Sequence, residues 1–311
     1  MIKLQALVGR AALSILAVAI TAVALASAAS AQQSFKTPQE AVETLVNAVR
    51  AGDSKAVNAI LGPGAEQIMS SGDAVQDENT RKLFLAAYDA RHSVAESAGK
   101  PATLLIGADD YPFAIPIARK GDGWTFDSAA GRKELLARRI GRNELGAIRV
   151  CLGYHDAQYE YAATTKVDDL AVYAQRVVST AGKKDGLYWP TAAGEQPSPL
   201  GEAVAEASLR GYRVGSGAPY RGYYYKILTR QGPNAPGGAH DYIVNGKMIG
   251  GFALIAWPAE YGNSGITTFM INHDGVVYQK DLGNDTSKVA ARTTAFDPDS
   301  TWQKVEAVVF D

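Results

Sequence analysis

The stretch at residues 142–163, RNELGAIRVCLGYHDAQYEYAA, constrains the fold of this chain more than any other. Its apolar residues recur three and four apart, which predicts a long amphipathic helix with this stripe: Leu145, Ile148, Leu152, His155, Tyr159 and Ala162. Arg142, Arg149 and Asp156 recur on the opposite face, which is expected to contact solvent. A stripe of this length needs an apolar partner, and the alternating segments that follow the helix are suited to that role.

Residues 1–31 have the pattern of a secretory signal peptide. Lys3 and Arg10 are the only charges, a long apolar run follows, and Ala-Ser-Ala precedes Gln32. This order of basic, apolar and small residues predicts cleavage after Ala31 and export to the periplasm. A retained membrane anchor is the alternative interpretation, although the apolar run is short for a membrane span.

The rest of the chain is long enough for two domains, which we expect at residues 32–140 and 141–311. Hydrophobic residues make up 47% of the chain and charged residues 20%, as in an ordinary globular protein. Without Lys3 and Arg10 the formal net charge moves from −1 to −3, so neither nucleic acid nor an anionic membrane surface is an expected partner. No segment after cleavage is long and apolar enough to be a membrane helix.

The first domain opens with helices that local capping rules define. Thr37 is suited to cap the first helix, a proline follows it, and Glu40 completes a capping box. Asp53 is expected to cap a second helix at residues 54–61, and a third helix is expected at residues 78–92.

The hydrophobic period then changes to that of strands, at residues 102–107, 111–119 and 124–127. Helices followed by antiparallel strands indicate an α+β fold. The run TPQEAVETLVNAVRAGDSKAVNAIL, followed by such a sheet, resembles the cone-shaped cystatin-like fold of the nuclear-transport-factor and polyketide-cyclase-like families. This resemblance implies a small cone-shaped domain but no particular activity, because these folds occur in enzymes and non-enzymes alike.

Residues 128–140 are basic and helix-prone, and Gly141 is expected to end this helix before the main helix begins. The segment and its neighbour carry a positive cluster: Arg132, Lys133, Arg138, Arg139 and Arg142. We interpret the cluster as a solvated helix face that pairs with Glu134 and Glu144. An anion-binding site is the alternative.

The second domain is expected to place the main helix on an antiparallel meander. Two further helices are expected at residues 168–180 and 201–210. Strands are expected at residues 223–229, 249–257, 266–272 and 276–281. An Asp-Gly pair at Asp274 predicts that the last two strands form a hairpin.

The segment YHDAQYEYA on the main helix and the later stretch GITTFMINHDGVVYQKDL resemble the globular part of type IV pilins and pseudopilins. The resemblance implies a pilin-like long helix packed on an antiparallel meander. Pilins carry an unbroken apolar stem ahead of this helix. Here that place holds the charged residues from Arg132 to Arg139, which cannot form such a stem.

Taken whole, the chain resembles an exported bacterial family of unknown function, domain of unknown function 2950. The motifs that carry this resemblance are RRIGRNELGAIRVCLGYHDAQYEYA and NAPGGAHDYIVNGKMIGGFALIAWPAEYGNSGITTFMINHDGVVYQKDLG. The resemblance covers nearly all of the mature chain and implies no activity and no catalytic residues.

Cys151 is the only cysteine, so the chain forms no internal disulfide. It lies beside the apolar stripe, and we interpret it as a small buried hydrophobe. His155 lies one helical turn away, which raises the alternative of a thiol nucleophile with its base. Two residues on consecutive turns of a packed face more often share the core, and no third catalytic group is evident.

The second domain contains enough histidines for a zinc site, namely His155, His240 and His273. Their spacing fits no zinc motif. Aspartates near the C-terminus offer oxygen ligands for calcium: Asp281, Asp285, Asp297 and Asp299. They lack the spacing of a calcium loop, so turns and caps are the favoured roles, and no metal or cofactor is predicted.

Glycines crowd the loops of the predicted sheet, especially at residues 230–241 and 257–265. Sheet corners explain such glycines, and a shaped surface that binds a partner is the alternative. Because binding residues concentrate on loops that a rigid scaffold supports, these two loops supply the candidate binding surface. Its residues are His240, Asp241, Trp257, Glu260 and Tyr261.

The function that the sequence favours is a non-catalytic periplasmic protein that binds an envelope component or another protein. No catalytic residue is predicted, because the chain contains no G-x-S-x-G, P-loop or dinucleotide motif. Two alternatives remain open: a hydrolase-type enzyme, and an accessory component of pilus or secretion machinery.

Overall fold

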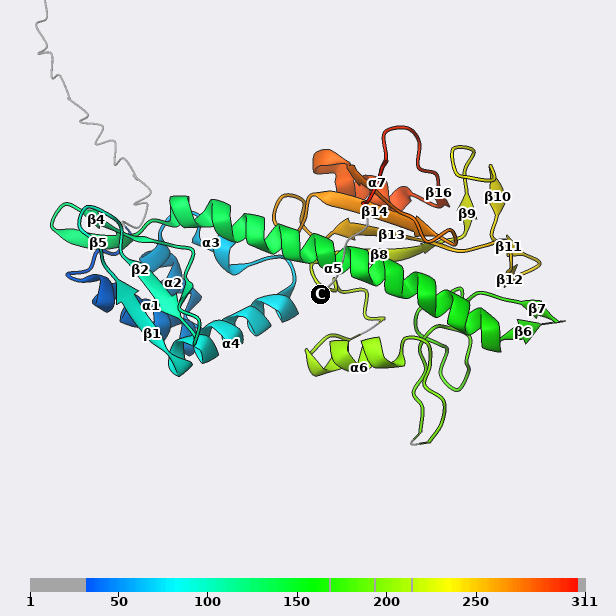
Figure 1. Cartoon of the computed structure of the whole chain (residues 1–311), viewed down its shortest axis with the longest axis horizontal. Helices are drawn as coiled ribbons and strands as arrows, with labels where there is room; N and C mark the ends of the chain where they lie inside the picture. The colour runs from blue at the N-terminus through cyan, green and yellow to red at the C-terminus, as the bar shows by residue number, and fades with distance from the viewer. Residues whose placement is uncertain (1–31, 168, 193, 214, 307–311) are drawn as a thin grey trace, which may run out of the picture. The chain divides into compact units, whose positions relative to one another are not determined.

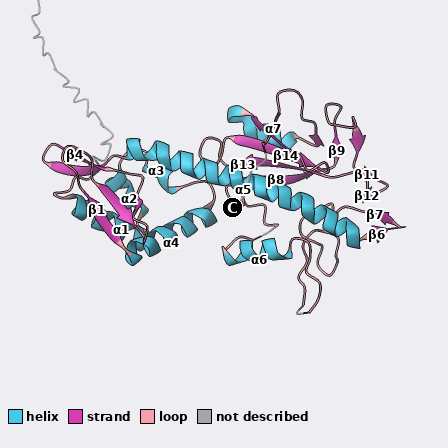
Figure 2. Cartoon of the chain, viewed as in Figure 1, coloured by secondary structure: helices cyan, strands magenta, loops and turns pink. Residues whose placement is uncertain are grey.

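The structure is a computed structural model that describes residues 32–306 except residues 168, 193 and 214. Helices and mainly antiparallel sheets share this part of the chain, which confirms the predicted α+β class (Figure 1). Figure 2 shows the two kinds of element along the chain. The predicted signal peptide lies outside the described residues. None of the described helices is long and apolar enough to cross a membrane.

The N-terminal part combines short helices with two small sheets. Its helices are α1 (Pro38–Ala51), α2 (Ser54–Leu61), α3 (Ala65–Met69) and α4 (Ala74–Ala90). Its strands are β1 (His92–Ala95), β2 (Thr103–Ile106), β3 (Tyr111–Pro112), β4 (Ile117–Lys120) and β5 (Gly123–Phe126). The first three strands form one antiparallel sheet, and β4 and β5 form a separate hairpin.

Local capping determines where the first helices begin. The Thr37 hydroxyl accepts a hydrogen bond from the Glu40 backbone N–H at 3.1 Å, and Asp53 accepts one from the Ala56 N–H at 2.9 Å. Both predicted caps are confirmed. The predicted start of the third helix was wrong, because Asp73 caps α4 by accepting the Gln76 N–H and so begins the helix at Ala74. Strand β1 and helix α3 were not predicted.

A single helix, α5 (Ser128–Thr164), runs through the position where a break was predicted. The prediction that Gly141 separates two helices was wrong. A glycine inside a helix costs only about 1 kcal/mol relative to alanine, and the residues on both sides are good helix formers. Asp127 caps the helix by accepting the Ala130 N–H at 2.9 Å. The same helix therefore serves both the N-terminal and the C-terminal parts.

The buried face of α5 is displaced from the predicted stripe. Leu145 and Tyr159 are each 44% exposed, although they were predicted to be buried. The face that is buried instead includes Asn143, Ala147, Cys151, Tyr154, Gln158 and Tyr161. Two of these residues are polar, so a search for apolar periodicity misses them. Each has its partners: Asn143 donates to Ser264 O at 2.8 Å, and Gln158 exchanges two 2.8 Å hydrogen bonds with Ala174.

The helix predicted at residues 168–180 was wrong. The described residues there contain turns, bends and isolated bridges together with the short strand β7 (Leu170–Ala171), which pairs with β6 (Lys166–Val167). The hydrogen bonds between Gln158 and Ala174 use the backbone groups that a helix would need, and the Tyr173 N–H donates to Met248 O at 2.8 Å. The next helix, α6 (Gly201–Leu209), agrees with the prediction.

The C-terminal part is built on one antiparallel sheet in the order β17-β15-β14-β13-β8. Its strands are β8 (Tyr223–Leu228), β13 (Ala253–Pro258), β14 (Thr267–Asn272), β15 (Val277–Asp281) and β17 (Gln303–Lys304). The hairpin between β14 and β15 is confirmed. Smaller elements complete this part: β9 (Arg230–Gln231), β10 (His240–Asp241), β11 (Ile243–Val244), β12 (Lys247–Met248), η1 (Gly283–Asp285), α7 (Thr286–Arg292) and β16 (Ala295–Phe296).

Helix α5 packs against β13, β14 and β15, which confirms that the main helix covers the later strands (Figure 1). Helix α7 also packs on β13, whose first four residues are buried. The buried apolar side chains form two clusters, one in each part of the chain. The proposed domain boundary after residue 140 stays a prediction.

Candidate functional site

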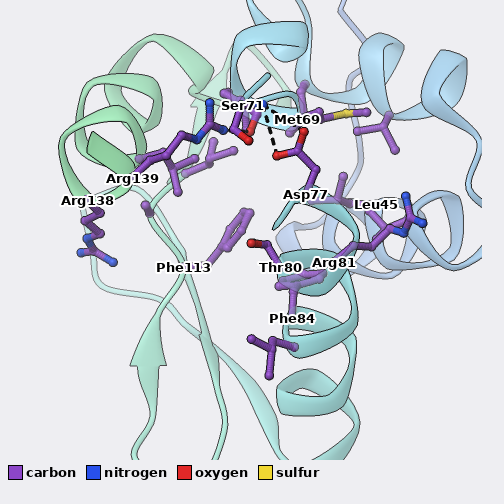
Figure 3. A pocket seen from close by; sticks show the side chains of 18 of the residues that line it. Leu45, Met69, Ser71, Asp77, Thr80, Arg81, Phe84, Phe113, Arg138 and Arg139 are labelled. Atoms are coloured by element: carbon purple, nitrogen blue, oxygen red, sulfur yellow. Dashed lines mark hydrogen bonds between the residues drawn. The ribbon is translucent and has the colours of Figure 1, made fainter. Parts of the chain in front are cut away.

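A cavity of about 460 Å³ lies in the N-terminal part, between α1, α4, α5 and the chain after β3 (Figure 3). Its interior is mainly apolar. The apolar side chains that line it include Leu45, Val57, Met69, Phe84, Phe113 and Leu135. Leu83 also lines the cavity and is 71% exposed, so apolar surface continues to the opening. A cavity of this size and composition is typical of sites for small, largely apolar ligands.

The space exists because α4 closes only part of the core below it. Tyr88 is the buried residue of this helix, whereas Leu83 and the partly buried Phe84 line the cavity. Phe84 contacts Phe113 across the cavity with their ring centroids 5.4 Å apart. Figure 3 shows Thr80 and Phe84 on α4 facing Phe113. The contact between Phe84 and Phe113 therefore holds the cavity walls together at one side, and the walls are separated elsewhere.

Arginines from α5 give the cavity a positive side. Arg139 is buried and donates to three backbone carbonyls, those of Gln67, Ile68 and Ser70. Gln67 and Ile68 lie in the last turn of α3 and Ser70 is its C-cap, where a helix leaves its last acceptors without partners. Burial lowers the pKa of Arg139, and the charge of Arg142 lowers it further. The charges of Asp77 and Glu260 act in the opposite direction and raise it. Arg139 therefore has a structural role, and nearby carboxylates partly offset its charge.

The other arginines at the cavity differ in how they are engaged. Arg138 forms a 2.6 Å ion pair with Glu134 and lies over the ring of Tyr111. Arg81 forms an ion pair with Glu78. Arg142 is exposed and lines the cavity, and within the described residues it makes no hydrogen bond and no ion pair. Arg142 is thus the guanidinium that is available to a ligand.

One acceptor at the cavity lacks a donor. Gln76 Nε2 donates to Asn143 Oδ1 at 2.7 Å, and Asn143 in turn donates to Ser264 O. This chain of donors fixes which way the Gln76 amide points and leaves its Oε1 buried without a partner. Asp77 accepts the Ser71 backbone N–H at 3.0 Å and is already engaged.

The residues predicted as a binding surface do not come together in one site. His240 and Asp241 lie on β10, where His240 Nε2 is 3.1 Å from Gly250 O, just before β13. Glu260 and Tyr261 follow the other end of β13, a six-residue strand that spans about 20 Å. The surface stays a prediction, and its residues lie near opposite ends of β13.

The loop that contains Glu260 and Tyr261 is held by its own contacts. Tyr261 donates to Asp281 at 3.2 Å, and this hydrogen bond raises the pKa of the Tyr261 phenol. Trp257 is half-buried beside Tyr224, with ring centroids 5.7 Å apart, and Glu260 accepts a hydrogen bond from Asn263. These contacts are sufficient to fix the conformation of the loop, so its shape does not require a bound ligand.

The histidines of the C-terminal part gather around two aromatic rings. Tyr242 lies between His240 and His273, with centroid distances of 5.5 Å and 5.7 Å. Phe252 lies between His155 and His273, at 5.8 Å and 6.2 Å. The part of the chain that the structure describes contains no group of three or more histidine, cysteine or acidic side chains arranged to hold a metal ion.

Cys151 is fully buried, as predicted. Burial raises the pKa of its thiol to about 12. The thiolate that a nucleophile requires is therefore scarcely populated at neutral pH. His155 Nδ1 lies 2.9 Å from Asp156 Oδ1, a hydrogen-bond acceptor, on the more exposed side of the helix.

Residues 32–305 match the family described as a protein of unknown function, DUF2950. The chain belongs to the DUF2950 family. This match confirms the resemblance that the two long motifs suggested, and it assigns no activity. No curated protein matches, and no solved structure matches. The cystatin-like and pilin-like resemblances of this DUF2950 chain therefore stay predictions.

The sequence did not predict the cavity. The one signal that pointed toward it was the basic cluster on α5, for which an anion-binding site was the alternative interpretation. The structure separates the members of that cluster: Arg139 binds carbonyls, Arg138 pairs with Glu134, and Arg142 stays available.

Proposed function

We propose that this protein is exported and is a non-catalytic binding protein whose N-terminal cavity receives a small, largely apolar component of the cell envelope. The observation that carries the proposal is the cavity of about 460 Å³, with an apolar interior and arginines along one side. Burial of apolar ligand surface supplies affinity, and the few polar groups orient the ligand.

The polar groups at the cavity favour binding over catalysis. Guanidinium groups stay protonated in proteins, so they bind and orient ligands but do not act as general acids or bases near neutral pH. Asp77 is the carboxylate among the lining residues, and it already accepts the Ser71 N–H. Cys151 lies in the other hydrophobic cluster, where burial suppresses its reactivity.

The export part of the proposal rests on residues 1–31. We expect N-terminal sequencing of the protein from a periplasmic fraction to begin at Gln32. Recovery of the full-length chain in the membrane fraction would contradict export as a cleaved protein.

The binding proposal is tested with the neutral fluorescent probe N-phenyl-1-naphthylamine. Thr80→Trp places a large side chain in the cavity, whereas Ala86→Trp places the same side chain on an exposed position of the same helix outside it. We expect the wild-type protein and Ala86→Trp to bind the probe equally, and Thr80→Trp to bind it at least about tenfold more weakly, a loss of about 1.4 kcal/mol. Equal binding by both variants, or no binding by the wild type, would refute the proposal.

The loop residues are a separate proposal for a partner surface. Since these residues lie near two ends of β13, each end is tested by its own double variant: His240→Ala with Asp241→Ala, and Glu260→Ala with Tyr261→Ala. If both double variants fold and fully restore the phenotype of a deletion strain, neither loop is the functional surface.

A further inference from the structure

One exposed charge at the cavity has no ion-pair partner within the described residues. The charged side chains that line it are Asp77, Arg81, Arg138, Arg139 and Arg142. Arg81 and Arg138 have their own carboxylate partners, Glu78 and Glu134. The carboxylates of Asp77 and Glu260 act on Arg139. Arg142 lines the cavity and forms no ion pair within the described residues, so its charge is not directly paired. A ligand that carries a negative charge would neutralise it.

The charge of Arg142 lies beside a second arginine. Arg139 and Arg142 lie one turn apart on α5, and their mutual repulsion contributes to the lowered pKa of Arg139. The nitrogens of Arg139 are occupied by backbone carbonyls, whereas those of Arg142 are available. An anion bound by Arg142 would offset this repulsion. It would also accept hydrogen bonds from the guanidinium N–H groups, whose planar arrangement suits carboxylate and phosphate groups.

The apolar surface lies away from this charge. Figure 3 shows Arg138 and Arg139 on α5 at one side, with Phe113 and then Thr80 and Phe84 of α4 across the cavity. The exposed side chain of Leu83 extends the apolar wall to the opening. A ligand that matches both regions has an apolar chain and a charged end.

We infer that the cavity binds a single-chain amphiphile with an anionic head group, with the chain against α4 and Phe113 and the head group at Arg142. This inference rests on the proposed function and specifies its ligand class. Fatty acids and other singly acylated anions share this chemistry.

Three ligands with the same ten-carbon chain test the inference: decanoate, decanol and decylammonium. Each competes with N-phenyl-1-naphthylamine for the exported protein at low ionic strength. We expect decanoate to bind about tenfold more tightly than decanol and decylammonium to bind most weakly, because the head group meets a positive charge. Lengthening decanoate to dodecanoate adds two methylenes and should tighten binding about fifteenfold, as each buried methylene contributes about fourfold.

Two variants assign the head-group site. Arg142→Gln removes the available guanidinium, and Lys133→Gln removes one charge from an exposed position of the same helix outside the cavity. We expect Arg142→Gln to weaken decanoate binding about tenfold with decanol unchanged, and Lys133→Gln to change neither. Circular dichroism confirms that both variants are folded.

The outcomes separate this inference from the proposed function. If decanol binds as tightly as decanoate, and Arg142→Gln changes neither, the cavity binds apolar ligands but the anionic head group is refuted. If Lys133→Gln weakens decanoate as much as Arg142→Gln does, overall charge and not Arg142 is responsible, which also refutes it. If neither the probe nor any chain binds, the proposed function itself fails.

Discussion

The two hydrophobic clusters of this protein are built from different side chains, and only one of them is filled. In the C-terminal cluster, Phe252 is fully buried and is surrounded by the rings of Tyr154, His155, Tyr159, Tyr173 and His273. In the N-terminal cluster, aliphatic side chains of α1 and α2 face an α4 that buries Tyr88 and leaves space beside it.

The difference shows how one helix contributes to two kinds of interior. The second half of α5 places Cys151, Tyr154 and Gln158 in a closed core. Its first half places Leu135, Arg138 and Arg142 at an open cavity. Close packing stabilises the first region, and the loss of packing in the second leaves room for a ligand.

Truncation of an aromatic ring in each region should give the largest contrast. Phe252→Ala removes a fully buried ring and is expected to cost about 3–5 kcal/mol of unfolding free energy. Phe113→Ala removes a half-buried ring that already borders a cavity, and is expected to cost about 1–2 kcal/mol. Urea denaturation measures both. Equal losses would show that the two interiors are packed alike.

Asp73 connects the two regions, and its removal should have the next largest effect. This buried carboxylate caps α4 and accepts hydrogen bonds from the Tyr212 hydroxyl at 2.9 Å and the Gly222 N–H at 3.0 Å. Asp73→Ala leaves both donors buried without a partner and is expected to cost about 3 kcal/mol.

Asp53→Ala is the matched control, since Asp53 caps α2, is exposed, and within the described residues accepts no hydrogen bond from the C-terminal part. Its expected cost is about 1 kcal/mol. If the two aspartate variants lose the same stability in urea denaturation, the contacts of Asp73 with Tyr212 and Gly222 contribute nothing.

Cys151→Ala should have a smaller effect. The substitution removes one buried sulfur atom from the filled core and is expected to cost about 1 kcal/mol, with probe binding in the distant cavity unchanged. Thermal unfolding measures the stability, and titration with N-phenyl-1-naphthylamine measures the probe binding. A folded variant with lost binding would restore a functional role for the thiol.

The smallest effect concerns pH. Burial lowers the pKa of His273, although Asp274 raises it, and the neighbouring His240 and His155 lower it further. Because the unfolded chain binds a proton near pH 6.5 and the folded ring resists it, stability falls as pH drops through that value. His273→Gln should make the decline in unfolding free energy between about pH 7 and pH 5 shallower. An unchanged or steeper decline would contradict the direction of this shift.

Features that depend on neighbouring residues in the chain were predictable from the sequence. The caps at Thr37 and Asp53 and the hairpin at Asp274 each involve residues within a few positions of one another. The class of fold follows from such elements taken in order.

Features that depend on distant partners were not predictable. Asn143 and Gln158 are polar but buried, because Ser264 and Ala174 supply their hydrogen bonds from elsewhere in the chain. The break at Gly141 was wrong for a similar reason: packing on both sides of the glycine holds α5 continuous. The cavity forms where side chains from different segments do not pack against one another. The hydrophobic periodicity of a single segment cannot predict such a space.

The most direct test of the contrast between an open and a filled interior is the methyl NMR spectrum of the protein during titration with decanoate. We expect resonances of Leu45, Val57 and Leu135 at the cavity to shift, and those of Leu228, Leu254 and Ile271 in the filled core to stay in place. Shifts confined to the second set, or no shifts in either set at saturating decanoate, would contradict the account.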